Sequence, residues 1–189
     1  TVKATLSKPS AGKMAWQLDC NHRLLHPEYG GAAGLKKSTL LLGYGNIDRQ
    51  DDGVAWHILR EIAAAFAVDL PEYPQETLFQ LAPAITAAFA LQLTPEDAEF
   101  VSGFDQVCFI DAHTGRVEDE VNWEMIQASF EPSPFTHHLT PATCLALASS
   151  LYQKKPRAAL VSVRGYEFGF ERQLSPRTKE LVPSAAQRI

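Results

Sequence analysis

The sequence predicts a three-layer α/β/α domain with a mainly parallel sheet. From Ser38 onward, short apolar runs alternate with segments whose apolar residues recur at helical spacing, which is the pattern of repeated strand–helix units. Residues 106–110 are apolar almost throughout and include β-branched and aromatic side chains, as expected for a strand that is buried on both faces. Such a strand needs helices on both sides of its sheet, and this requirement gives the three layers.

The first half of the domain begins with a strand, a turn and a helix. Residues 39–42 are the first expected strand, and a glycine-rich turn leads from it into a helix over residues 54–68, one face of which is apolar. Residues 78–81 are a short strand candidate. The next helix is expected to start at Thr94, because this hydroxyl residue is followed by a proline in the first turn and an acid three residues on.

The second half continues the alternation. Apolar and polar side chains alternate over residues 121–125, which predicts a half-buried strand near an edge of the sheet. Residues 141–153 are predicted to form a helix that Thr140 caps, and residues 158–163 the last buried strand. A C-terminal helix is expected to begin at Ser175-Pro176.

Composition excludes several classes of protein. The hydrophobic fraction of 46% and the charged fraction of 21% are ordinary for a soluble globular protein. A formal net charge of −5 without a long basic run argues against nucleic acid as the main partner, and the basic cluster over residues 154–157 is interpreted as a loop between a helix and a strand. No apolar stretch is long enough to span a bilayer, and no secretory signal is recognised, so a cytoplasmic location is expected.

The cysteine spacing indicates the redox compartment, and the N-terminal composition indicates where the folded domain begins. Cys20, Cys108 and Cys144 are widely spaced and form no CxxC pair, which argues against a disulfide framework or a zinc ribbon and suits a reducing compartment. Residues 1–37 show little periodicity and are interpreted as an N-terminal extension, either packed on the domain or partly disordered. Residues 38–189 are interpreted as a single α/β domain.

Two adjacent carboxylates, Asp51 and Asp52, stand where the first turn becomes a helix. Open α/β folds keep their ligand sites at this edge of the sheet, so these side chains could cap backbone amides, bind a cation, or do both. One aspartate would be enough for capping, which leaves the second free to face outward. We interpret Asp51 as the cap that orients Asp52, and Asn46 as a residue that holds the turn or offers its amide to a substrate.

Further candidate ligands follow later core elements. Asp111 ends the buried strand, either as a cap of its own turn or as a ligand at the same edge, and His113 would share its face if the strand continues. His137 and His138 precede a helix, where a histidine is expected to be neutral and therefore able to bind a metal, unless it is simply a surface residue. Two acids and an imidazole from three loops are typical of a site for a borderline divalent metal.

Two rival sites are less favoured. A dinucleotide fingerprint would need a third glycine where Asp48 stands, and the neighbouring acids would repel a pyrophosphate. Cys108 lies in a buried strand and Cys144 on the apolar face of a helix, so both are interpreted as small core residues rather than nucleophiles. The sequence also has no G-x-S-x-G elbow and no H-E-x-x-H pair.

Four motifs resemble those of the [NiFe]-hydrogenase maturation endopeptidases. They occur in the family's order, from Ser38 to the end of the sequence. They are Gly43-Tyr44-Gly45-Asn46 with Asp51-Asp52-Gly53-Val54, then Phe109-Ile110-Asp111-Ala112, then His137-His138-Leu139-Thr140, and finally residues 165–169 with 174–176. His138 stands where the family usually has glutamine, and Asp48 and Arg49 replace residues that are often apolar.

The resemblance implies a fold, a reaction and a set of ligands. The family has a twisted sheet of about five strands between helices, and its members remove a short C-terminal extension from the hydrogenase large-subunit precursor after nickel insertion. Its metal-contacting residues carry over to Asp52, Asp111 and His137, with Asn46, Asp51, His113 and His138 in support. The expected partner is that precursor, and the nickel is expected to come with it.

The resemblance also sets the remaining expectations and leaves two alternatives. We expect a monomeric peptidase-like domain that needs no nucleotide cofactor and binds neither nucleic acid nor membrane. One alternative is a non-catalytic module of the same fold that holds a hydrogenase subunit or a metal. The other, less favoured, is a nucleotide-binding α/β protein.

Overall fold

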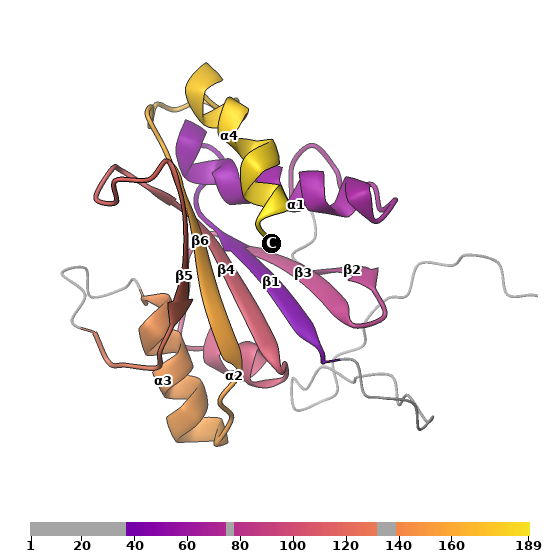
Figure 1. The fold of residues 1–189 in the computed structure, drawn as a ribbon, viewed down its shortest axis with the longest axis vertical. Helices are drawn as coiled ribbons and strands as arrows, with labels where there is room; N and C mark the ends of the chain where they lie inside the picture. Colours follow the sequence, from indigo (N-terminus) through magenta and orange to yellow (C-terminus); the bar gives the residue numbers. More distant parts are fainter. Residues whose placement is uncertain (1–36, 75–77, 132–138) are drawn as a thin grey trace, which may run out of the picture. The chain divides into compact units, whose positions relative to one another are not determined.

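A six-stranded sheet forms the centre of the molecule in the computed structural model, which describes residues 37–74, 78–131 and 139–189. Four strands are mutually parallel and occupy the interior, and the two edge strands run antiparallel to their neighbours (Figure 1). In spatial order the strands are β2 (Leu78–Ala82), β3 (Ile85–Ala90), β1 (Thr39–Tyr44), β4 (Gln106–His113), β6 (Arg157–Arg164) and β5 (Val121–Ile126). The predicted fold class is confirmed, with one strand more than expected.

Helices cover both faces of this sheet. The short 3-10 helix η1 (Gln50–Gly53) leads into α1 (Val54–Ala65), which packs against α4 (Pro176–Gln187). On the opposite face, α2 (Asp97–Ser102) packs against α3 (Pro141–Tyr152) (Figure 1). In the described residues no helix is both long and apolar enough to cross a membrane.

Alternating side chains of the strands supply two separate cores. Leu41 and Ile110 face α1 and α4, whereas Leu40, Leu42 and Phe109 face α2 and α3. All five side chains are buried, as expected for central strands with helices on both sides. Asp111 therefore lies on a rigid frame, because it belongs to a strand that is packed on both faces.

Most predicted elements are present, and two predicted caps are confirmed. The Thr140 hydroxyl accepts a hydrogen bond from the Thr143 amide at the start of α3, and Ser175 accepts one from the Thr178 amide at the start of α4. The edge position of residues 121–125 is also confirmed, since β5 pairs only with β6 among the described strands.

Three details differ from the prediction. Thr94 does not cap a helix, because the chain first makes a turn in which the Thr94 amide donates to Asp97, and α2 begins at Asp97. The predicted helix over residues 54–68 ends at Ala65, since Ala67 adopts a left-handed conformation. Strand β3 was not predicted, because its Ile-Thr-Ala-Ala-Phe-Ala sequence combines alanines with little apolar alternation.

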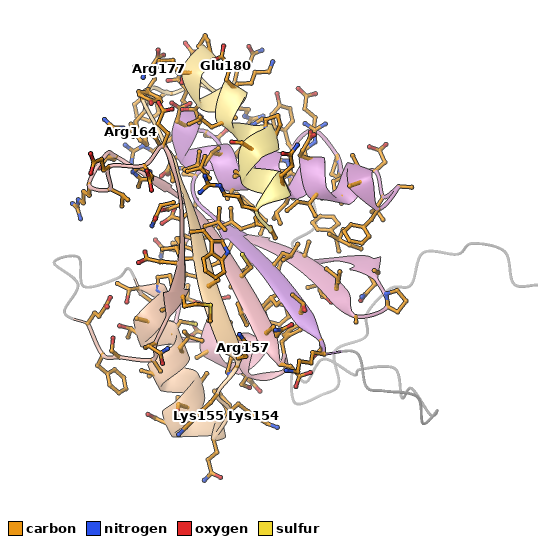
Figure 2. All side chains as sticks on the ribbon, viewed as in Figure 1. Lys154, Lys155, Arg157, Arg164, Arg177 and Glu180 are labelled. Carbon is orange, nitrogen blue, oxygen red and sulfur yellow. The ribbon has the colours of Figure 1, made fainter. Side chains whose placement is uncertain are left out.

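The two ends of β6 carry different groups (Figure 2). Lys154, Lys155 and Arg157 lie in and next to the loop between α3 and β6, as predicted, at the end where the parallel strands begin. Arg164 lies at the other end, where the parallel strands finish, and this edge also holds Asp111 and, near it, Asp52. The predicted N-terminal extension, apart from Lys37, lies outside the described residues.

Candidate functional site

Asp51 is fully buried and is an anchor for the C-terminal part of the chain. Its Oδ2 accepts hydrogen bonds from the amides of Tyr166 and Glu167, both at 2.8 Å. The Ser175 amide donates to Oδ1 at 2.7 Å, and the hydroxyls of Ser175 and Thr178 donate to Oδ2 at the same distance. Burial alone would raise the pKa of Asp51, but these hydrogen bonds outweigh it and the net pKa is lowered.

The interpretation of Asp51 as the cap of the first helix is wrong. The residue at the cap position of α1 is Gly53, and no side chain donates or accepts there. Asp51 lies one turn earlier, in η1, and points at the loop before α4. Gln50 adds to the same attachment, because its side chain binds the Glu167 carboxylate and the Gly169 amide.

Asp52 has a different environment from its neighbour. It is only partly buried, and its Oδ2 accepts a hydrogen bond from the Asn46 amide at 3.0 Å. The Asn46 side chain accepts from the Asp48 amide at 2.9 Å, so Asn46 holds the turn, which was one of its two predicted roles. Within the described ranges nothing donates to the other oxygen of Asp52, Oδ1. That oxygen is therefore free for a ligand.

The turn brings Gly45 against the backbone of Asp52. Gly45 has a φ of +140°, and a Cβ placed on it would lie 2.0 Å from the Asp52 carbonyl oxygen. A side chain cannot fit there without moving the turn. This close approach is enough to explain why position 45 is a glycine, so the residue does not by itself indicate a phosphate-binding turn.

Asp111 lies at the same edge of the sheet as Asp52. It follows Ile110, which pairs with Gly43 of β1, and its own partner in β6 is Ser162. The Ala112 amide donates to Asp111 Oδ1 at 2.7 Å. Strand β4 continues beyond it to His113, as the sequence allowed.

Asp52 and Asp111 are close enough for their charges to interact. Burial raises the pKa of Asp111 to about 7, and the negative charge of Asp52 acts in the same direction. The Tyr44 hydroxyl and the hydrogen bond from the Ala112 amide oppose the rise without cancelling it. A cation between the two carboxylates would relieve both the burial cost and the repulsion.

Tyr44 is a member of this group that sequence reasoning did not select. It is the last residue of β1, and its hydroxyl lies near enough to the Asp111 carboxylate for the two groups to influence each other. Burial raises its pKa well above the usual value, and the Asp111 charge adds to the effect. Only the alternation of β1 could have indicated it, since Leu42 and Tyr44 lie on the same face as Phe109 and Asp111.

His113 does not join the two carboxylates. Its Nδ1 accepts a hydrogen bond from the Gly115 amide at 3.2 Å. Burial lowers its pKa, and the nearby charge of Arg164 lowers it further. Among the described residues, no three His, Cys, Asp or Glu side chains are grouped closely enough to hold a metal ion.

His137 and His138 lie outside the described residues. The description resumes at Leu139, whose amide donates to the Leu93 carbonyl at 3.4 Å. Two residues later α3 begins, and its Cys144 lies near enough to Tyr44 to influence the Tyr44 hydroxyl. The described chain therefore returns to the Tyr44 side of the sheet directly after the predicted histidines.

The two described cysteines are core residues, as predicted. Cys108 and Cys144 are buried, and burial raises the pKa of each thiol to about 12. A thiol with such a pKa remains protonated at neutral pH and is a poor nucleophile.

Solved structures with the same arrangement are known. The hydrogenase maturating endopeptidase HybD from E. coli has a TM-score of 0.55 at 16% identity, over 80% of this chain and 88% of that one. The [NiFe] hydrogenase maturation protease HycI from Thermococcus kodakarensis has a TM-score of 0.56 at 16% identity, over 82% and 91%. The chain has the fold of the hydrogenase maturation proteases. No family model and no curated protein sequence matches it.

Proposed function

We propose that this protein is an endopeptidase that removes a C-terminal extension from the precursor of a [NiFe]-hydrogenase large subunit. Asp52, Asp111 and His137 would recognise nickel that the precursor already carries. The observation that carries the proposal is the meeting of Asp52 and Asp111 at one edge of the sheet, from two separate connections. The shared fold and the activities for which its structural neighbours are named, maturation endopeptidase and maturation protease, support the same reaction.

The two carboxylates are suited to meet a metal on a substrate. A backbone amide holds one oxygen of each, Asp52 Oδ2 and Asp111 Oδ1. The orientation of both groups is therefore largely set before the substrate arrives, which reduces the entropy lost on binding. His137 would add a nitrogen ligand, and an oxygen, oxygen and nitrogen set suits a borderline divalent ion such as nickel.

In this proposal nickel serves to position the substrate. A precursor held through its metal places the scissile bond at the site, and such placement lowers the entropic part of the barrier. The anchor at Asp51 supports the reaction indirectly, because it fixes the backbone of η1 on which Asp52 stands.

The direct test compares precursor processing by four variants. Asp52→Ala, Asp111→Ala and His137→Ala should each reduce the processing rate by roughly 100-fold or more, since each removes a contact that places the substrate. Asp48→Ala is the matched control, because this exposed carboxylate lies in the same turn but pairs with Arg172. Processing at the wild-type rate by the three site variants would refute the site.

Nickel dependence is tested with the precursor rather than the enzyme. A precursor prepared without nickel should remain uncut, and addition of nickel to it should restore cleavage. Equal cleavage of both forms would contradict metal recognition while leaving a peptidase. A protein that binds the nickel-loaded precursor and never cuts it would instead be the non-catalytic module.

A further inference from the structure

A cleft of about 600 Å³ lies between α1, α4 and the connection that follows α1 (Figure 1). Its floor is apolar, because the buried side chains of Leu70, Leu174 and Val182 line it. Small-molecule sites commonly have volumes of roughly 300–1,000 Å³, and this cleft is within that range. Neither Asp52 nor Asp111 lines it, so the cleft is separate from the site described above.

Arg60 brings a positive charge into this cleft without a counterion. Its side chain is half-buried in the wall that α1 forms. The ion pairs among the described residues join Arg172 to Asp48 and Arg177 to Glu120, and none includes Arg60. The Arg60 Nε is buried and has no hydrogen-bond partner within the described ranges. A buried donor is costly until an acceptor reaches it, so this guanidinium is suited to an anion.

His57 and Lys179 add two more nitrogen groups to the same cleft. His57 is three positions before Arg60 and therefore shares its face of α1, and its Nε2 is also buried without a partner in the described part of the chain. Burial lowers the pKa of His57, and the charges of Arg60 and Lys179 lower it further, against opposing effects of the Arg172 backbone and Glu72. The imidazole is therefore neutral and lies close to both cations.

The acidic side chains of the cleft do not neutralise this group. Glu61, Asp69 and Glu72 line the cleft too, but all three are exposed, and none forms an ion pair among the described residues. Water screens exposed carboxylates strongly. The half-buried part of the cleft, which holds Arg60 and His57, is therefore cationic.

The ligand chemistry follows from the guanidinium and the apolar floor. The planar fork of an arginine matches the two oxygens of a carboxylate and can donate to both. An apolar floor favours an organic group over a bare inorganic anion. Tyr73 and Arg172 close one wall, with the guanidinium 4.8 Å from the centre of the ring, so Arg172 is already engaged there and at Asp48.

We propose that this cleft binds an organic carboxylate. Its oxygens accept hydrogen bonds from Arg60 and His57, and its apolar part lies on the floor of Leu70, Leu174 and Val182. The C-terminus of a peptide and a free organic acid share this chemistry. The inference goes beyond the proposed function and does not depend on it.

The test uses the full chain and three probes. N-acetyl-leucine represents a peptide C-terminus, N-acetyl-leucinamide is the same molecule without the charge, and benzoate represents a free organic acid. Calorimetric titration measures the affinity of each probe for the wild type, Arg60→Gln and Arg60→Lys. Arg116→Gln is the matched control, because this exposed arginine does not line the cleft. A thermal melt shows whether each variant is folded.

At least one of the two carboxylates should bind the wild type, and N-acetyl-leucinamide should bind at least about 10-fold more weakly than N-acetyl-leucine. Arg60→Gln should weaken carboxylate binding by about 10- to 100-fold. Arg60→Lys should weaken it less, because the charge remains while the fork is lost. Arg116→Gln should match the wild type. Tighter binding of N-acetyl-leucine than of benzoate would assign the cleft to a peptide terminus, and the reverse order to a free acid.

Three results would overturn the proposal. They are failure of both carboxylates to bind the wild type at millimolar concentration, equal affinity of folded Arg60→Gln and the wild type, and equal affinity of the acid and its amide. The last comparison needs only the wild type, so it remains decisive if a variant does not fold. Precursor processing is measured separately and bears on the proposed function alone.

Discussion

Asp51 and Asp52 are adjacent and chemically identical, yet they belong to different parts of the molecule. Asp51 is fully buried, and three amides and two hydroxyls donate to it. Asp52 lies at the edge with one amide donor and a nearby second carboxylate, that of Asp111. The comparison teaches that the donors around each carboxylate, rather than its place in the sequence, decide whether it belongs to the fold or to the edge of the sheet.

Asp111 makes the same point from the opposite direction. Burial of its carboxyl group and the negative charge of Asp52 outweigh the hydrogen bond from the Ala112 amide, and its pKa is raised to about 7. The pKa of Asp51 is lowered. Asp51 thus stabilises the fold as a charged carboxylate. At the edge of the sheet, the charge of Asp111 is not balanced by the hydrogen bonds around it.

The largest expected change in stability follows from removal of the Asp51 carboxylate. Asp51→Ala leaves three buried amides without an acceptor and removes two hydroxyl hydrogen bonds, so it should lower the free energy of unfolding by about 3–5 kcal/mol. Urea denaturation followed by circular dichroism measures the change. The exposed Asp48→Ala should change it by less than about 0.5 kcal/mol. An Asp51→Ala protein as stable as the wild type would show that the hydrogen bonds at Asp51 do not hold the fold.

Substitution of Asp111 is expected to change the free energy of unfolding by a smaller amount and in the opposite direction. The folded state binds the Asp111 proton more tightly than the unfolded state, so ionisation of Asp111 costs stability as pH rises from about 4 through 7. Asp111→Asn removes that cost and should stabilise the metal-free protein by about 1–2 kcal/mol at pH 8, a value reduced for partial exposure.

The pH dependence provides the control for this prediction. At about pH 4 the wild-type carboxyl is protonated in the folded state, and the stability difference between Asp111→Asn and wild type should disappear. Denaturation curves for both proteins at the two pH values measure it. A stabilisation of equal size at both pH values would point to packing rather than charge.

The smallest effect is expected at Asp52. Asp52→Asn keeps an oxygen that can accept from the Asn46 amide, so the free energy of unfolding should change by less than about 0.5 kcal/mol. Metal titration of the same variant should nevertheless show weaker binding, because a carboxylate ligand is lost. A large loss of stability would mean that Asp52 shares the structural role of Asp51.

The sequence predicts what depends on short-range patterns. The caps at Thr140 and Ser175 need only residues three positions away, and the central strand at residues 106–110 needs only its own apolar run. Strand β3 escaped prediction because its alanines have weak strand preference and their burial depends on neighbouring strands.

The site was predictable only in part for a related physical reason. The edge position of Asp111 follows from the direction of parallel strands, and Asp52 lies near enough for its charge to raise the pKa of Asp111. The partners of Asp51 are 115 to 127 positions away, and no local pattern shows them. Tyr44 could not be separated from an ordinary core aromatic, because its significance comes from the neighbouring strand.

The anchor has a consequence for the order of events during synthesis. Asp51 is translated early, but Ser175, which supplies two of its five donors, is made 124 residues later. Until the last helix leaves the ribosome these hydrogen bonds cannot form, so a nascent or C-terminally truncated chain lacks the contacts that hold η1, the segment that carries Asp52. Synthesis of the C-terminal helix is therefore required before the backbone beneath Asp52 is fixed.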